Sequence, residues 1–326
     1  MPRRAGPMAL AALASLAGIA AGCAGTATSS GSFERTLSVT GPARLELQNG
    51  SGSAQITAGE AGQVRVRGEF RVRTWSWENL SRRVEELSSN PPIEQQGNLV
   101  RIGSSKYKEL LRSVTINYTI VVPAETKLQA EVGSGSVKVQ GIHGPARLIA
   151  GSGGISAERI REDVQASTGS GGIALADVGG EVRASTGSGS ITMSEIRGDI
   201  RASTGSGGIT IAEPGGRITA KTGSGGVTVN GAAADLRASA GSGHLSIEGS
   251  PAAGSYWELR TGSGGVDISV PASASFRLHA HSGSGGIALS VPAVIEERSR
   301  HEMRARVGSG AARIEVRTSS GGIHIR

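Results

Sequence analysis

The sequence predicts an all-β protein: a parallel β-helix, or β-solenoid, with 18-residue rungs of two short strands, plus an N-terminal cap containing one short helix. The first observation is a Gly-Ser-Gly turn that recurs every 18 residues, beginning at Gly133, Gly151, Gly169, Gly187, Gly205, Gly223 and Gly241. The second is the composition, because 51 of the 326 residues are glycine and only three each are Trp, Tyr and Phe. The core must therefore use small and β-branched side chains, shared between stacked repeats.

Each period contains two stretches in which apolar and polar residues alternate. In residues 187–204, Ile191 and Met193 follow the first turn, and Ile200 and Ala202 follow the second. Because alternate residues of a strand share a face, each period predicts two strands with one apolar face. A narrow cross-section is indicated by an inward column of alanines: Ala166, Ala184, Ala202, Ala220 and Ala238. We also expect the glycines to adopt positive φ and the corner threonines (Thr168, Thr186, Thr204) to bond to the turn backbone.

The start of the chain predicts a lipoprotein signal peptide (residues 1–22) and a short tether (residues 23–32). Arg3 and Arg4 precede an apolar segment that is shorter than the roughly 20 residues of a membrane span. This segment leads to Cys23, the only cysteine, in a context similar to a bacterial lipobox, although Ala20 stands where leucine is usual. Cys23 is the predicted lipidation site. We therefore expect an exported chain, anchored by lipid to the cell envelope, at the outer membrane or the cell surface.

The remaining chain divides into an N-terminal β-rich cap region (residues 33–131) and the β-solenoid repeats (residues 132–326). Trp77, Leu80, Val84 and Leu87 recur at helical spacing, which predicts a short helix near residues 75–88. The GSGS sequence at residues 50–53 indicates a first, irregular rung. Toward the other end, residues 295–306 predict a charged excursion, and residues 322–326 predict a strand at the free edge.

Outward positions near the second strand form ordered polar columns. The acidic column is Asp163, Glu181, Asp199 and Asp235, and the basic column two residues later includes Arg183, Arg201 and Arg237. Two interpretations stay open: a solvated charge ladder that keeps the strands soluble and in register, or a surface that binds a ligand. The net charge is +7, or +5 without residues 1–22. This suits an anionic membrane surface or a polysaccharide and is too diffuse to indicate nucleic-acid binding.

Several sequence features together resemble a bacterial family of candidate adhesins built from β-strand repeats. They are VVPA at residues 121–124, Leu128, GSGSVKV at residues 133–139, GIHG at residues 141–144 and the repeated TGSGG turns. The family is largely described as a domain of unknown function and is related to autotransporter adhesin heads. The resemblance covers residues 40–326 and implies a β-helical fold and an envelope location. It supplies no established catalytic residues.

No motif predicts catalysis, a metal or another cofactor. The glycine turns lack the Gly-Lys-Ser/Thr ending of a nucleotide-binding loop and lead into strands. They also carry serine where calcium-binding turns carry aspartate. His279 and His281 share a strand face, but no third ligand completes a zinc site. We therefore expect neither nucleotide nor metal at these positions.

The sequence thus predicts a non-enzymatic envelope lipoprotein whose solenoid binds or scaffolds through repeated polar outer faces, as an adhesin would. Its expected partners are the membrane, through the lipid, and a glycan or an envelope protein. One alternative is a structural or signalling component that binds a single protein, which could add a strand to residues 322–326. Another is a polysaccharide-acting enzyme, which needs clustered carboxylates. The best candidates for it are Glu296, Glu297 and Glu302 with His301, in a charged loop.

Overall fold

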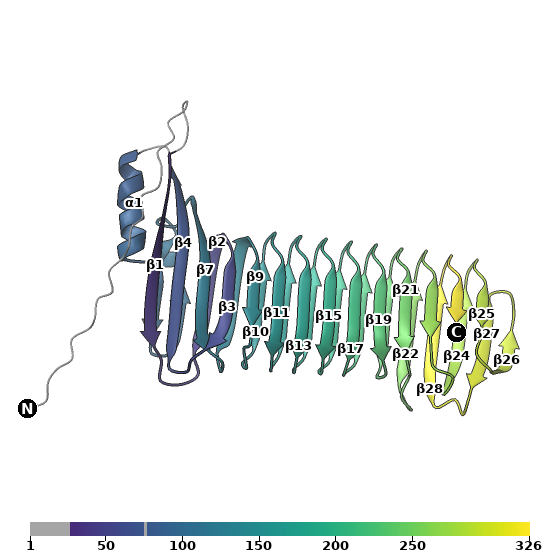
Figure 1. The fold of residues 1–326 in the computed structure, drawn as a ribbon. Helices are drawn as coiled ribbons and strands as arrows, with labels where there is room; N and C mark the ends of the chain where they lie inside the picture. Colours follow the sequence, from purple (N-terminus) through teal and green to yellow (C-terminus); the bar gives the residue numbers. More distant parts are fainter. Residues whose placement is uncertain (1–26, 75–76) are drawn as a thin grey trace, which may run out of the picture.

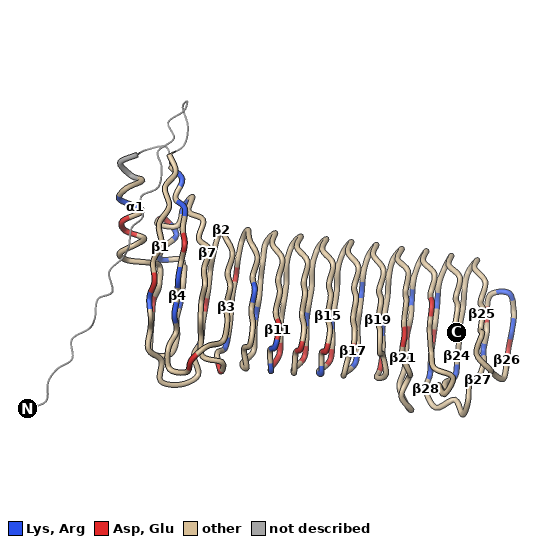
Figure 2. Tube along the Cα trace, viewed as in Figure 1, with Lys and Arg blue, Asp and Glu red and all other residues tan. Residues whose placement is uncertain are grey.

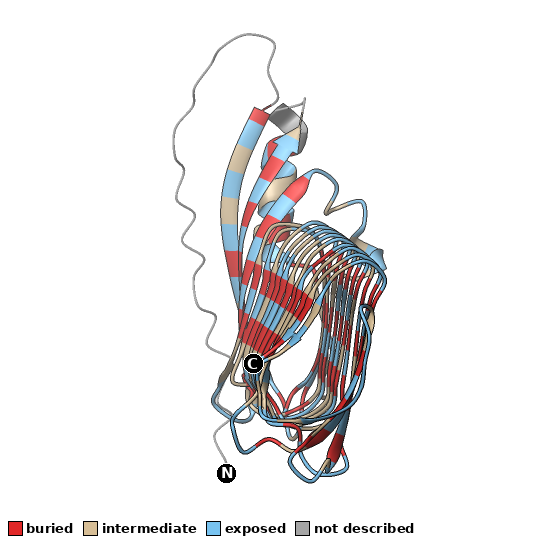
Figure 3. Cartoon of the chain, turned by 90° about the vertical axis from the view of Figure 1, so that its right-hand side faces the viewer, coloured by how far each residue is buried: buried red, intermediate tan, exposed pale blue. Residues whose placement is uncertain are grey.

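The computed structural model describes residues 27–74 and 77–326 and confirms a β-solenoid. The chain winds between two sheets, so that each coil adds one strand to a 15-stranded sheet and then one strand to a 14-stranded sheet (Figure 1). Seen along the axis, the coils superpose, and the buried residues line the space between the sheets (Figure 3). The predicted signal peptide and Cys23 lie outside the described residues.

Both sheets are long, and their strand order follows the stacking of the coils. The 15-stranded sheet contains, in spatial order, β5 (Ile93–Gln96), β6 (Leu99–Ile102), β2 (Arg44–Ser51), β8 (Lys127–Ser134), β10 (Ala146–Ala150), β12 (Val164–Thr168), β14 (Val182–Thr186), β16 (Ile200–Thr204), β18 (Ile218–Thr222), β20 (Leu236–Ala240), β22 (Tyr256–Thr261), β28 (Ala312–Thr318), β24 (Phe276–Ser282), β27 (Glu302–Val307) and β26 (Val294–Arg298). The 14-stranded sheet contains β1 (Ala27–Ser38), β4 (Gln63–Thr74), β7 (Val114–Pro123), β3 (Ala54–Gly59), β9 (Val137–Gln140), β11 (Ile155–Ile160), β13 (Ile173–Val178), β15 (Ile191–Ile196), β17 (Ile209–Pro214), β19 (Val227–Ala232), β21 (Leu245–Gly249), β23 (Val266–Ser269), β29 (Ile323–Ile325) and β25 (Ile287–Leu289).

The regular coils stack in the register that the 18-residue period predicts. β14 pairs in parallel with β12 and β16, so that Ala184 lies between Ala166 and Ala202. Each of these alanines is at most 3% exposed. Because every coil offers the same apolar columns to its neighbours, the interior is one continuous core.

Buried threonines hold the GSG corners. Thr186 Oγ1 donates to the carbonyl oxygen of Gly171 at 2.8 Å and accepts a hydrogen bond from the N–H of Gly189 at 3.2 Å. The same pair of bonds at Thr168 and Thr204 confirms the predicted role of this column. The prediction of positive φ is wrong for the GSG glycines between residues 151 and 264. They are glycine for a steric reason, because a Cβ on Gly189 would overlap the carbonyl oxygen of Gly171 in the coil before.

An N-terminal cap covers one end of the rod. β7 pairs in parallel with β3, and β4 then pairs antiparallel with β7 and with β1. α1 (Trp77–Ser89) agrees with the helix predicted near residues 75–88, and it packs against β1 and β4 with Leu80 and Leu87 buried. A short 3₁₀ helix, η1 (Ser105–Tyr107), precedes β7. Across the described ranges, no helix has both the length and the apolar character needed to cross a membrane.

The predicted segment boundaries differ from the strands at two places. β1 begins at Ala27, so residues 27–32 of the predicted tether are strand and pair with β4. β8 crosses the predicted boundary between residues 131 and 132. The first, irregular coil predicted from the GSGS sequence is present inside the cap region: it consists of β2 and β3, and GSGS spans the end of β2 and the turn into β3. Strand pairing defines a coil, and the glycine period marks it only where the repeat is regular.

The C-terminal coil is inserted between two coils that precede it in the chain. β28 lies between β22 and β24, and β29 lies between β23 and β25. The prediction of a free edge at residues 322–326 is therefore wrong, because β29 is paired on both sides. The predicted charged excursion is an antiparallel hairpin of β26 and β27. β26 is the edge strand, where Val294 is 55% and Ile295 44% exposed.

Candidate functional site

The outer face of the 15-stranded sheet carries two rows of side chains in the middle of the rod. The strands from β10 to β20 each have two outward positions, and the parallel register stacks them coil over coil. The first row is Arg147, Gln165, Arg183, Arg201, Thr219 and Arg237, and the second is Ile149, Ser167, Ser185, Ser203, Lys221 and Ser239. The GSG corners along one side of the rod carry no charged residues, whereas the strands and the opposite corners do (Figure 2).

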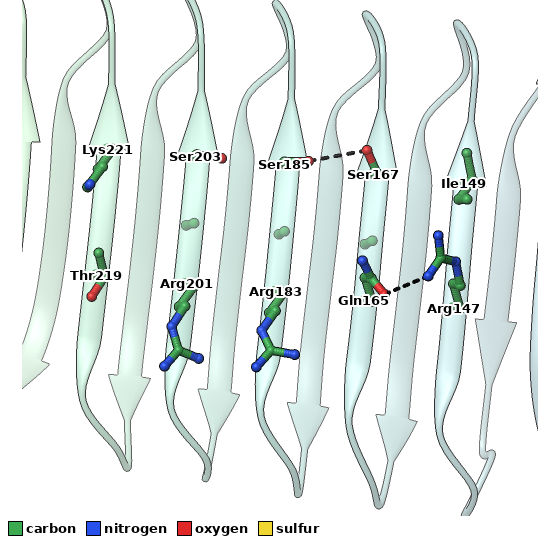
Figure 4. A pocket seen from close by; sticks show the side chains of 13 residues that line it. Arg147, Ile149, Gln165, Ser167, Arg183, Ser185, Arg201, Ser203, Thr219 and Lys221 are labelled. Carbon is green, nitrogen blue, oxygen red and sulfur yellow. Dashed lines mark hydrogen bonds between the residues drawn. The ribbon is translucent and has the colours of Figure 1, made fainter.

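A trough of about 430 Å³ runs along the rod between the two rows (Figure 4). We call it the basic trough. It consists of the row residues on β10 to β18, with Ala166, Ala184 and Ala202 contributing to its floor. Its lining includes four cationic residues, Arg147, Arg183, Arg201 and Lys221, and no carboxylate.

Hydrogen bonds and ion pairs position the side chains of the basic trough. Arg147 Nη1 donates to Gln165 Oε1 at 3.2 Å, and the hydroxyls of Ser167 and Ser185 lie 3.2 Å apart (Figure 4). Arg183 and Arg201 both pair with Glu181, Arg183 at 3.0 Å. The single carboxylate of Glu181 therefore forms ion pairs with two guanidinium groups. Both arginine side chains remain more than half exposed to solvent.

The predicted acidic column does not share the trough with the arginines. Asp163, Asp199 and Asp235 lie at the corners before the strands. Each accepts a hydrogen bond from a backbone N–H of the next coil, namely Glu181 at 2.8 Å, Arg217 at 3.0 Å and Tyr256 at 2.9 Å. These aspartates therefore connect neighbouring coils, and Glu181 alone faces the arginines. Arg237 lies beyond the trough and pairs with Glu258 at 3.4 Å.

A second hollow, of about 710 Å³, lies at the corner that leads from the 14-stranded to the 15-stranded sheet. Arg159, Arg161, Arg197 and Asp177 line it, and Arg197 pairs with Asp177 at 3.5 Å. Arg159 and Asp177 adopt positive φ, 56° and 50°. In this hollow the carboxylate that pairs with an arginine is part of the lining, whereas Glu181, which pairs with the trough arginines, lies outside the lining of the basic trough.

The carboxylates considered for catalysis each pair with an arginine, Glu302 with Arg304 at 2.9 Å. Glu302 Oε1 lies 3.0 Å from His279 Nε2, and this hydrogen bond lowers the pKa of the Glu302 carboxyl. A general acid of a glycosidase requires the opposite shift. The other two pair with arginines, Glu297 with Arg304 at 3.3 Å and Glu296 with Arg306 at 3.8 Å. In the part of the chain that the structure describes, no group of three His, Cys, Asp or Glu residues is placed to hold a metal ion.

The sequence analysis missed two cations of the basic trough, Arg147 and Lys221. Arg147 lies 18 residues before Gln165, and Lys221 lies 18 residues after Ser203. Applying the 18-residue period to both outward positions of every strand from β10 to β18 identifies both residues.

A family model matches the chain over the cap and the whole solenoid. Residues 29–326 match the model of the Toastrack DUF4097 family. The chain belongs to this family. The predicted resemblance to a β-repeat family of unknown function is thereby confirmed. No curated protein matches the Toastrack chain.

Two solved structures are similar to the Toastrack chain at low identity. A candidate cell adhesion protein from Clostridium sporogenes is 12% identical and has a TM-score of 0.21, with 90% of this chain and 98% of that chain covered. A candidate adhesin from Bacteroides fragilis is 10% identical and has a TM-score of 0.33, with 90% of this chain and 97% of that chain covered. At these TM-scores neither likeness bears on what the chain binds.

Proposed function

We propose that this Toastrack protein is a non-enzymatic envelope lipoprotein that binds a ligand along the basic trough, as an adhesin does. The supporting observation is the trough itself, where cations and hydroxyls repeat at equivalent positions of successive coils. Many weak contacts of one kind add up along such a surface. The pairing of Glu296, Glu297 and Glu302 with arginines argues against hydrolysis at that cluster.

The anchor in this proposal is a lipid on Cys23, at the outer membrane or the cell surface. β1 begins four residues later, at Ala27. Four residues span at most about 14 Å when fully extended. The lipid would therefore hold the cap end of the rod close to the membrane and leave the C-terminal end distal to it. Fatty-acid labelling of the wild-type chain, lost in a Cys23→Ser variant, is the expected result.

Ligand binding is tested with the purified Cys23→Ser chain, which has no thiol to carry the lipid. We expect it to bind to cells and to a subset of glycans on an array, without consuming them. The proposal is contradicted if both assays are blank, or if hydrolase or lyase activity is detected instead. Protease treatment of intact cells locates the anchored chain, because only a surface-exposed rod is removed.

A second candidate function is recognition of one envelope protein at the free edge of the 15-stranded sheet. The observation that favours it is β26, an edge strand with exposed Val294 and Ile295. An extended segment of a partner could pair with this edge. Crosslinking in cells from residue 295 would give one dominant protein adduct if this function is correct, and dispersed or no adducts if it is not.

A further inference from the structure

We infer that the ligand of the basic trough is a linear acidic polysaccharide, which lies parallel to the solenoid axis and presents a carboxylate at regular intervals. This inference rests on the proposed function and adds the ligand class and its orientation. Four properties of the trough carry it: a bounded positive charge, incomplete charge compensation, a row of hydroxyls, and a recessed lining without aromatic rings.

The positive charge of the first row is confined to the middle of the rod. The parallel register continues this row from Arg147 to Gln129 and Glu46 at the cap end. At the other end it continues from Arg237 to Glu258 and Glu315. The cationic segment from β10 to β20 spans five strand spacings, or about 24 Å. Beyond this length, Glu46, Glu258 and Glu315 each pair with at least one arginine, so the positive charge there is compensated. A polyanion is therefore attracted most strongly over the cationic segment.

The cations of the trough are not matched by equal numbers of carboxylates. Glu181 is shared by Arg183 and Arg201. Among the described residues, no carboxylate forms an ion pair with Arg147 or Lys221. Four cations face one carboxylate, so three positive charges remain for a ligand. Guanidinium groups bind carboxylates through two parallel hydrogen bonds, which favours a ligand that offers carboxylates in sequence.

The second row supplies hydroxyl groups beside the cations. Ser167, Ser185 and Ser203 lie at equivalent positions of neighbouring coils. A hydroxyl both donates and accepts hydrogen bonds, as the hydroxyls of a sugar ring do. Each coil advances the rows by about 4.8 Å, a distance comparable to one sugar residue in an extended polysaccharide. An acidic polysaccharide along the axis can therefore meet a cation and a hydroxyl at successive residues.

The lining of the trough disfavours two other polyanions. It contains no aromatic ring on which the bases of a single-stranded nucleic acid could stack. The cationic side chains line a recess, and Ile149 is the only large apolar residue among them, so the trough offers no apolar face to insert into a bilayer. A single polysaccharide chain fits the recess better than either.

The experiment measures binding of oligogalacturonates of increasing length to the Cys23→Ser chain, with neutral dextran as the uncharged probe. Affinity should rise with length until the oligosaccharide spans the cationic segment and then level off. The trough variant Arg183→Gln/Arg201→Gln should weaken binding at least about tenfold, because it removes two charge-assisted contacts. The control variant Arg65→Gln/Arg71→Gln removes the same charge from the exposed face of β4 and should change affinity less than about twofold.

Lys221→Gln provides a second test, because Lys221 has no ion pair among the described residues whose loss could disturb the fold. It should weaken oligogalacturonate binding as well, with an unchanged melting temperature. The inference is overturned if the trough variants bind normally, if dextran binds equally well, or if anionic vesicles or single-stranded DNA bind more tightly at the trough. Binding to neutral glycans alone would overturn the inference and leave the proposed function intact. Absence of binding to every glycan and to cells would overturn the proposed function itself.

Discussion

The second glycine of the Gly-Ser-Gly corner, at its third position, tolerates no side chain. A Cβ on Gly189 would overlap the carbonyl oxygen of Gly171, whereas a Cβ on Gly208, one position further along its corner, would have its nearest neighbour at 3.6 Å. We expect Gly189→Ala to lower the free energy of unfolding by about 1–3 kcal/mol through overpacking. Gly208→Ala is the matched control and should have a small effect, since Ser190 already occupies that column. Equal losses in urea unfolding would contradict this explanation.

A different column of residues carries backbone strain at the opposite corner. Arg159, Asp177, Glu195 and Glu213 adopt positive φ, and the same column holds glycine at positions 141 and 231. The conformation costs an L-residue roughly 1–2 kcal/mol, against about 0.5–1 kcal/mol of extra chain entropy for glycine. Glu195→Gly should therefore raise the free energy of unfolding by about 0.5 kcal/mol. Glu195→Gln keeps the strain and removes only the charge, so a gain as large as that of glycine would refute the strain argument.

A half-buried hydrogen bond joins the inserted C-terminal coil to its neighbour. Tyr256 Oη on β22 donates to Glu315 Oε2 on β28 at 2.6 Å. Burial, and then the bond to Glu315, raises the pKa of Tyr256 from 10.0 to about 12. The stabilisation is complete below the ordinary pKa of 10.0 and is lost as the pH rises toward about 12.

Tyr256→Phe should remove this part of the alkaline destabilisation. The measurement is the melting temperature across that pH range, with the tyrosinate absorbance followed in parallel. The wild-type curve should fall more steeply than the variant curve. Parallel curves would show that the hydrogen bond does not stabilise the junction between β22 and β28.

The order of the C-terminal strands could not be predicted from their sequences. β22, β24 and β28 all present alternating apolar residues to the core, so each is a suitable neighbour for the others. Chain order favours β24 next to β22, yet β28 occupies that place. The hairpin of β26 and β27 lies between β24 and β28 in sequence and gives the chain enough length to return.

At the scale of the whole molecule, the rod is a stack of interchangeable coils. Deletion of residues 187–204 removes one full period and joins Thr186 to Gly205, which reproduces the native junction between Thr186 and Gly187. We expect the shortened chain to fold and its rod to be about 4.8 Å shorter by small-angle scattering. Deletion of residues 187–195 removes half a period and should prevent folding. β16, a strand of the 15-stranded sheet, would then follow β14 directly and would have to take the place of β15 in the 14-stranded sheet. Equal folding of both variants would argue against the stacked register.

The basic trough also belongs to the whole molecule, although its members were partly visible in the sequence. Arg183 and Arg201 were identified from the period, and the parallel register brings them to one face. The sequence did not separate the arginines from the acidic column, because residues two apart in a strand share a face. In the structure Asp163 and Asp199 turn to backbone groups of the next coil, which removes them from the trough.

The solenoid, the composition of its core and the register of its regular coils could all be predicted from the sequence. The prediction is possible because the 18-residue period repeats the same turns and the same apolar positions in each coil. Each regular coil packs mainly against the coils next to it, so these local patterns also define the stacking. Contacts outside the repeat determine the position of the C-terminal coil and the requirement for glycine at the corners. The position of the C-terminal coil depends on contacts between segments that the 18-residue period does not relate. The requirement for glycine depends on the distance between stacked backbones, which the pattern of side chains does not reveal.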